Sequence, residues 1–247
     1  MQRTKRLRVF GGPNGSGKST VYQDVKIFFS EIPFINADEI ETLISKKKLI
    51  DLDHYKLNLK PADWTKFLKR KESRSLIEKA KQSGHTINLV LRENCIVTES
   101  SETQSYEASL IASFIRWALY KKGNSFAFET VMSHEGKLQE LKDARKNGFK
   151  IYLYFVCIDD PLINIERVKD RVKKGGHNVN SEKLQSRYLN TLKNLHKAIK
   201  LSDKVFLFDN SEKIPQFIAE ISSERLIINT DSLPDWFIQF VLPYYNK

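Results

Sequence analysis

One segment constrains this chain more than any other, the glycine-rich run Gly12-Pro-Asn-Gly-Ser-Gly-Lys-Ser19. It fits the Walker A pattern GxxxxGK[ST], whose glycines let the backbone curl and point successive N–H groups at phosphate oxygens. The lysine of the pattern reaches the terminal phosphates, and its last hydroxyl holds Mg²⁺. Apolar residues 7–10 predict a strand before the run, and the uninterrupted stretch to about residue 29 predicts a helix after it. The run therefore predicts binding of a nucleoside triphosphate with Mg²⁺.

The nucleotide-binding prediction covers the whole loop and the start of its helix. Lys18 is expected at the terminal phosphates, and Ser19 is expected to ligate Mg²⁺. A glycine-rich turn that carries a lysine by chance is the alternative, and the flanking strand and helix argue against it. The residues expected to contact ATP are Gly12, Pro13, Asn14, Gly15, Ser16, Gly17, Lys18, Ser19 and Thr20.

Strands and helices are predicted to alternate along most of the chain, which indicates an α/β fold. We predict a P-loop kinase-type parallel sheet flanked by helices, in a single domain over residues 1–247. Residues from about 46 to 104 are polar, lack the alternation and are predicted to form a small inserted lobe. The strand at 150–158 is apolar throughout and is predicted to be central in the sheet. The other expected strands are 34–36, 125–129, 204–208 and 225–228, with a strand or hairpin at 86–91 inside the insertion, and the expected helices begin at 37 and span 106–121, 137–147, 163–174 and 181–201.

The composition is that of a globular protein with an excess of positive charge. Lysine and arginine number 41 against 30 acidic residues, a formal charge of +11, which favours anionic partners or leaves solvated lysine-rich faces. Neither cysteine, Cys95 or Cys157, belongs to a CxxC motif, so no disulfide framework or zinc site is indicated. The basic N-terminus is too poor in apolar residues for a signal peptide, and the apolar helix at 109–120 is too short to span a bilayer. We expect a cytoplasmic protein with no membrane partner.

Carboxylates follow two of the predicted strands, and ligands of open α/β sheets bind beyond the carboxyl ends of the strands. Asp38 follows the second strand, where it suits either a base that takes a proton from an attacking hydroxyl or a helix cap. Glu129 and Thr130 end a later strand, with Ser133 shortly after. These side chains suit either the hydroxyls of a sugar or an N-cap cluster, and both interpretations stay open.

A basic helix lies in the second half of the chain. Arg167, Arg171 and Lys174 recur at helical spacing on one face, and Gly175-Gly-His177 and Arg187 follow. Arginines stabilise the charge that spreads over a phosphoryl group during transfer, and a glycine pair suits a lid that closes over the site. A solvated cationic face is the alternative interpretation.

Asp159 and Asp160 end the strongest predicted strand. A carboxylate at such a position can support Mg²⁺ beside a phosphate-binding loop. Because Pro161 follows, a turn that ends the strand explains the pair equally well, and we do not count either aspartate among the catalytic residues.

Taken in order, these motifs resemble the zeta-toxin family of P-loop kinases. The resemblance covers residues 5–45 and 123–211 well and the C-terminal residues loosely. The combination of Phe-Glu-Thr with Gly-Gly-His is its most specific part. The segments that carry it are Gly12 to Thr20, Asn36 to Glu39, Phe128 to Thr130 with Ser133, Arg167 to His177, Arg187-Tyr188, Phe208 to Ser211 and Leu233 to Trp236.

The resemblance implies a kinase that uses ATP to phosphorylate a nucleotide sugar, UDP-N-acetylglucosamine, and an antitoxin as its protein partner. By this resemblance Asp38 is the base that activates the sugar hydroxyl, Lys18 binds phosphate and Ser19 holds Mg²⁺. The other implied site residues are the substrate contacts Asn36, Glu129, Thr130 and Ser133, two charge-neutralising arginines among Arg167, Arg171 and Arg187, and Asn210 near the adenine.

The segment at about 46–104 departs from the resemblance because it is longer and more polar than expected, and this leaves the acceptor open. The leading hypothesis is a phosphotransferase acting on a hydroxyl of a small anionic acceptor. A second hypothesis, motivated by the net charge, is a nucleic-acid-associated P-loop ATPase or a polynucleotide kinase. Aromatic residues do not interleave with the basic ones, so nucleic acid is not the favoured partner. A third is a nucleotide-binding partner of an acidic antitoxin, with little turnover of its own.

Overall fold

The structure is a computed structural model that describes residues 4–29, 31–173 and 181–245, without the side chains of residues 171, 181 and 182. The chain divides into two compact units. One comprises Met1–Glu31 and Ala127–Lys247, and the other comprises Ile32–Phe126.

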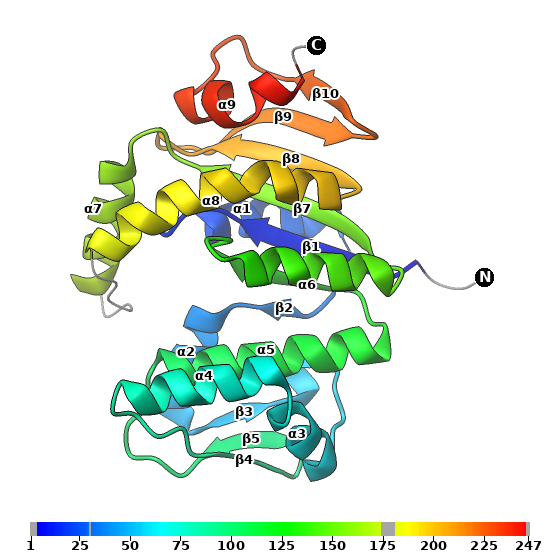
Figure 1. Cartoon of the computed structure of the whole chain (residues 1–247), viewed down its shortest axis with the longest axis vertical. Helices are drawn as coiled ribbons and strands as arrows, with labels where there is room; N and C mark the ends of the chain where they lie inside the picture. Colours follow the sequence, from blue (N-terminus) through cyan, green and yellow to red (C-terminus); the bar gives the residue numbers. More distant parts are fainter. Residues whose placement is uncertain (1–3, 30, 174–180, 246–247) are drawn as a thin grey trace. The chain divides into compact units, whose positions relative to one another are not determined.

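The first unit is built on a mixed, mostly parallel sheet with the strand order β10-β9-β8-β7-β1-β6 (Figure 1). Interior strand β7 pairs in parallel with β1 on one side and with β8 on the other. The antiparallel strands β9 and β10 extend the sheet beyond β8. The strand bounds are β1 Arg6–Gly11, β6 Phe126–Thr130, β7 Lys150–Cys157, β8 Lys204–Asp209, β9 Gln216–Ser222 and β10 Arg225–Ile228.

Helices cover both faces of this sheet, which confirms the predicted α/β class. Figure 1 shows α6 and α8 on the near face and α1 on the far face. The core lies on the interior strands, where Val9, Leu153, Phe155 and Leu207 are fully buried. The helices of this unit are α1 Lys18–Val25 with the 3-10 turn η1 Lys26–Phe28, α6 Glu135–Lys146, α7 Pro161–Lys173, α8 Ser181–Leu201, α9 Asp235–Phe240 and the 3-10 turn η3 Leu242–Tyr244.

The second unit contains the predicted insertion and extends beyond it on both sides. Its three-stranded antiparallel sheet has the order β3-β5-β4, and aromatic side chains of α3 and α5, Trp64, Phe67 and Phe114, pack together in its core. The segment predicted as an inserted lobe is therefore folded around a core. The elements are β2 Phe34–Ile35, α2 Ala37–Lys47, β3 Leu49–Asp51, the 3-10 turn η2 Asp53–Tyr55, α3 Pro61–Leu68, α4 Lys71–Gln82, β4 Leu89–Arg92, β5 Cys95–Thr98 and α5 Ser105–Lys122.

One strand of the large sheet, β9, was not predicted from the sequence. It joins β10 through the two-residue turn Ser223-Glu224, in which both residues have positive φ, 49° and 66°. Turns of this kind normally carry asparagine, aspartate or glycine, and Ser-Glu gives no such signal. Among the helices of the described ranges, none has the length and apolarity needed to cross a membrane.

Candidate functional site

The glycine-rich loop connects β1 to α1 and turns sharply at three glycines. Gly12, Gly15 and Gly17 all have positive φ, and Gly17 is the N-cap of α1 in a left-handed conformation. A Cβ on Gly12 would lie only 2.0 Å from the carbonyl oxygen of Val156 in β7, so the loop lies close against the sheet. The N-terminus of α1 carries no acidic residue in its first turn. Its unpaired N–H groups and helix dipole favour an anion at this point.

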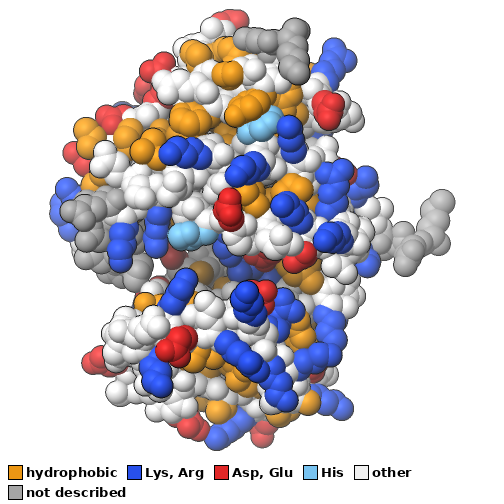
Figure 2. All heavy atoms as spheres, viewed as in Figure 1, with side chains coloured by type: hydrophobic (Ala, Val, Ile, Leu, Met, Phe, Trp, Pro, Cys, Tyr) orange, Lys and Arg blue, Asp and Glu red, His pale blue; other side chains and the backbone are white. Residues whose placement is uncertain are grey.

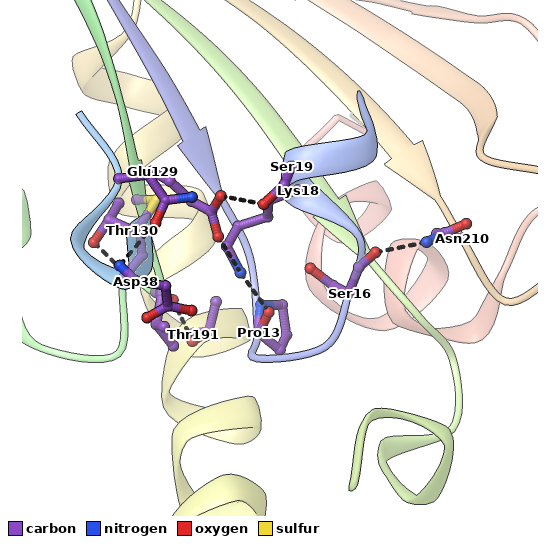
Figure 3. Close-up of polar contacts among 12 residues, drawn as sticks. Pro13, Ser16, Lys18, Ser19, Asp38, Glu129, Thr130, Thr191 and Asn210 are labelled. Carbon is purple, nitrogen blue, oxygen red and sulfur yellow. Dashed lines mark hydrogen bonds and ion pairs between the residues drawn. The ribbon is translucent and has the colours of Figure 1, made fainter. Parts of the chain in front are cut away.

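The lysine of the loop is held in place by two neighbours. Lys18 is only 5% exposed, and its Nζ donates a hydrogen bond to the carbonyl oxygen of Pro13 at 2.7 Å. The same Nζ lies 3.6 Å from Oε1 of Glu129, at the end of β6 (Figure 3). A buried ammonium group needs such partners, because burial without them is costly.

Glu129 also contacts the residue expected to ligate magnesium. The hydroxyl of Ser19 donates to Oε2 of Glu129 at 2.7 Å, so one carboxylate bridges Ser19 and Lys18. The sequence predicted Glu129 as a substrate contact and gave no sign of this bridge. The strand order could have revealed it, because β6 is the neighbour of β1 and its end meets the loop. A hydroxyl and a carboxylate are oxygen ligands suited to Mg²⁺.

Asn210, predicted to lie near the adenine, contacts the loop itself. Its side-chain nitrogen donates to the carbonyl oxygen of Ser16 at 2.9 Å (Figure 3), and a Cβ on Gly17 would lie 2.1 Å from that nitrogen. Arg167 donates to the backbone oxygens of Asn210 and Glu212 at 3.0 and 3.4 Å. Arg167 therefore fixes the turn after β8, and the adenine contact of Asn210 stays a prediction.

The turn after β6 is strained and is held by α8. Met132 has φ of 59°, a conformation that costs an L-residue roughly 1–2 kcal/mol. Thr191 donates to the carbonyl oxygen of Val131 at 2.7 Å, and Asn194 donates to that of Met132 at 3.0 Å. Both hydrogen bonds come from the helix that also carries Arg187. The predicted substrate residues Thr130 and Ser133 flank this turn, and each is 9% exposed.

The two aspartates after β7 have structural partners. The Asp159 carboxylate accepts hydrogen bonds from the backbone N–H groups of Asp235 and Trp236 at 3.0 and 2.9 Å, and so caps α9. Asp160 accepts one from the N–H of Leu162 at 2.8 Å, at the start of α7. These contacts favour the turn interpretation of the pair over magnesium support.

Asn36 and Asp38 belong to the second unit, at the start of α2. Asn36 is the N-cap, and its side-chain oxygen accepts a hydrogen bond from the N–H of Asp38 at 2.9 Å. The alternative that Asp38 caps this helix is therefore wrong, and Asn36 has that role. Asp38 lies in the first turn with an exposed side chain, and its role as a base stays a prediction.

The structure describes some of the remaining predicted site residues, and others lie outside the described residues. Thr20 is exposed on α1, Ser16 is fully buried, Asn14 and Gly15 are half-buried, and Arg187 is half-buried on α8. The side chain of Arg171, together with Lys174 and residues 175–177, lies outside the described residues. Within the described part of the chain, no three metal-binding side chains of the His, Cys, Asp or Glu types gather, and both cysteines are free thiols. Burial raises the pKa of the Cys157 thiol.

Comparison with known sequences matches the chain to a family model and to a relative. A family model described as Zeta toxin matches residues 91–218. An uncharacterized protein of Haemophilus influenzae is 35% identical over 68 residues, which cover 28% of this chain and 49% of that protein. The chain therefore spans about half the length of this relative.

Comparison with solved structures finds the same fold in a larger protein. The AvrRxo1-ORF1:AvrRxo1-ORF2 complex with sulphate ions matches with a TM-score of 0.58 at 12% identity. That match covers 97% of this chain but 64% of the other, under two thirds of its length. The same complex solved with ATP matches with a TM-score of 0.50 at 13% identity, over 92% of this chain and 61% of the other. At such identities the likeness shows the fold alone.

Proposed function

The chain belongs to the zeta toxin family, whose model covers just over half of its residues, and on this basis we propose that it is an ATP-dependent kinase of a small anionic acceptor. One observation carries the proposal: the Glu129 carboxylate bridges Lys18 and Ser19 at the N-terminus of α1. A lysine, a hydroxyl and a carboxylate beside a helix N-terminus are the groups that phosphoryl transfer needs around the phosphates and Mg²⁺.

The loop provides the donor side of the proposed reaction. Backbone N–H groups of residues 12 and 14–18 would hold the phosphates, and Lys18 would exchange its contacts with Pro13 and Glu129 for the terminal phosphate. Ser19 and Glu129 would hold Mg²⁺, which neutralises charge on the phosphates when it is bound. A structural neighbour solved with ATP supports ATP as the donor.

The acceptor side rests on the family resemblance. We assign Asp38 as the base that takes the proton from the acceptor hydroxyl, and a nucleotide sugar, UDP-N-acetylglucosamine, as the acceptor. Arg171 and Arg187 neutralise the charge of the moving phosphoryl group. Arg167 is the weakest of the three candidates, because it already binds two backbone oxygens. The remaining acceptor contacts proposed are Asn36, Thr130 and Ser133.

A protein partner belongs to the same proposal. Family membership and a structural neighbour solved as a complex of two proteins support an antitoxin partner. Nucleic acid is the less favoured partner, since Figure 2 shows lysine and arginine side chains scattered among acidic and apolar ones on the face in view. Purification of the chain from cells that carry its neighbouring genes would show whether a second protein accompanies it.

Transfer of a labelled phosphate tests the proposal. Purified protein is incubated with Mg²⁺, ATP labelled at its terminal phosphate, and a panel of UDP-sugars, free sugars and short oligonucleotides. We expect label on UDP-N-acetylglucosamine, and none with Lys18→Ala. Label on another small molecule would keep the kinase and change its substrate, whereas label on oligonucleotides would favour the polynucleotide kinase. If ATP binds and no acceptor is labelled, the kinase proposal is wrong.

A further inference from the structure

Helix α9 is joined by hydrogen bonds to Asp159, which follows β7, and to Asp209, the last residue of β8. Trp236, which is 2% exposed, donates from its indole nitrogen to Oδ1 of Asp209 at 2.8 Å. Asp209 is the last residue of β8 and is itself buried. On the β7 side, Asp159 accepts the backbone N–H groups of Asp235 and Trp236. The start of the helix is thereby fixed to two adjacent parallel strands.

The same contacts fix the turn that follows β8. The second oxygen of Asp209 accepts the N–H of Ser211 at 3.0 Å, and the Ser211 hydroxyl accepts the N–H of Asp159 at 3.0 Å. The backbone N–H of Asn210 donates to the carbonyl oxygen of Cys157 at 2.8 Å. The turn at 209–211 therefore has little freedom while Trp236 is in place.

This turn supports the glycine-rich loop on its other side. Asn210 donates to the carbonyl oxygen of Ser16 at 2.9 Å (Figure 3), and its amide nitrogen lies only 2.1 Å from the place that a Cβ of Gly17 would occupy. Gly17 is the N-cap of α1, so Asn210 is packed against the point where the helix dipole and its N–H groups meet an anion. A short path thus runs from Trp236 through Asp209 and Asn210 to the anion-binding end of α1.

We propose that Trp236 is a positioning residue for the nucleotide loop and that α9 sets the affinity of the chain for ATP. The inference rests on the proposed function only in that the loop binds ATP, and it does not depend on phosphoryl transfer. Without the indole N–H, a buried oxygen of Asp209 loses its donor. The carboxylate then turns toward other donors, the turn at 209–211 shifts, and Asn210 no longer holds Ser16. The loop must be ordered at the moment of binding, which weakens ATP affinity.

The test compares two substitutions in adjacent residues of α9. Trp236→Phe keeps an aromatic ring and removes the N–H donor, whereas Phe237→Leu alters the packing of a fully buried neighbour that makes no side-chain hydrogen bond. For Trp236→Phe we expect the dissociation constant for ATP to rise by about tenfold, equivalent to about 1.4 kcal/mol. For Phe237→Leu we expect a lower unfolding temperature and an unchanged dissociation constant.

Amide hydrogen exchange of the nucleotide-free protein provides a second readout. Exchange of the peptide that spans residues 12–20 should be faster in Trp236→Phe than in the wild type and unchanged in Phe237→Leu. Wild-type ATP affinity and wild-type exchange in Trp236→Phe would overturn the inference. If the wild type binds ATP and phosphorylates nothing, the proposed function fails, while the comparison of ATP affinities still tests the role of Trp236. If the wild type does not bind ATP, amide hydrogen exchange of residues 12–20 alone tests the role of Trp236.

Discussion

At the scale of single residues, a substitution of Glu129 tests its proposed role beside Lys18 and Ser19. Its carboxylate pairs with Lys18 and accepts a hydrogen bond from Ser19. Glu129→Gln keeps the shape of the side chain and removes its charge. We expect Mg²⁺-dependent phosphoryl transfer to fall by about 10²-fold, and ATP binding in the presence of EDTA to tighten, because the carboxylate no longer competes with phosphate for Lys18. Transfer rates and ATP dissociation constants of the wild type and Glu129→Gln check this, and a variant that transfers phosphate at the wild-type rate would contradict the assigned role.

The glycines of the loop give a second residue-scale prediction. Gly17 has φ of 90°, and a Cβ there would lie 2.1 Å from the Asn210 amide. Because a left-handed conformation costs an L-residue roughly 1–2 kcal/mol before any clash, Gly17→Ala should weaken ATP binding by about tenfold or more. Gly136→Ala is the matched control, since a Cβ there meets nothing within 4 Å. Equal ATP affinity of the two variants would show that the loop does not bind ATP as described.

At the scale of elements, Asp203 ties the start of β8 to the start of β7. Its carboxylate accepts hydrogen bonds from the N–H of Ile151 at 2.8 Å and from Lys150 at 3.0 Å. Burial alone would raise the pKa of Asp203, but these two donors outweigh it and lower the pKa.

A group whose pKa is lowered by folding stabilises the protein above its unfolded pKa, about 3.9 for aspartate. That stabilisation is lost as the pH falls through the folded pKa. Asp203→Asn should therefore lower the free energy of unfolding at pH 7 by about 1 kcal/mol, and the difference from wild type should shrink below about pH 4. Urea unfolding at several pH values measures it, and a difference that persists at pH 2 would contradict the linkage.

The turn between β9 and β10 is a site where substitution should stabilise the fold. Ser223 and Glu224 occupy left-handed conformations that asparagine and glycine adopt at less cost. The double substitution Ser223→Asn, Glu224→Gly should raise the free energy of unfolding by about 1 kcal/mol. Thermal and urea unfolding would detect it, and a lower midpoint would mean that these side chains have partners in solution that stabilise the turn.

The sequence predicts the parts of this fold that depend on local composition, and it misses those that depend on unusual turns or distant contacts. Apolar runs and the loop pattern locate β1, β7, β8 and the helices α5, α6, α7 and α8 to within a few residues, because they depend on local composition, whereas α3, α4 and α9 were not predicted. Strand β9 was missed because its turn lacks the usual residues, and the bridge by Glu129 was missed because it joins residues 110 positions apart. The glycine pair Gly175-Gly176 falls outside the described residues, so the prediction of a lid stands untested.

At the scale of the whole molecule, the two units divide the proposed tasks. The first unit carries the loop, Glu129 and the arginine helices, which are the groups of the donor side. The second unit, over Ile32–Phe126, carries Asp38 and the folded segment that departs from the resemblance. We expect that segment to set the choice of acceptor, so that substitutions on it alter the Michaelis constant for the acceptor and leave that for ATP unchanged.

We propose that Asp38 activates an acceptor hydroxyl to attack ATP bound at the loop, and the proposed function requires this step. The most direct measurement is the rate of phosphoryl transfer by Asp38→Asn, made together with its dissociation constant for ATP. We predict a rate about 10²–10⁴-fold below wild type, the usual contribution of a general base, at an unchanged affinity for ATP. A variant that transfers phosphate at the wild-type rate would contradict the claim.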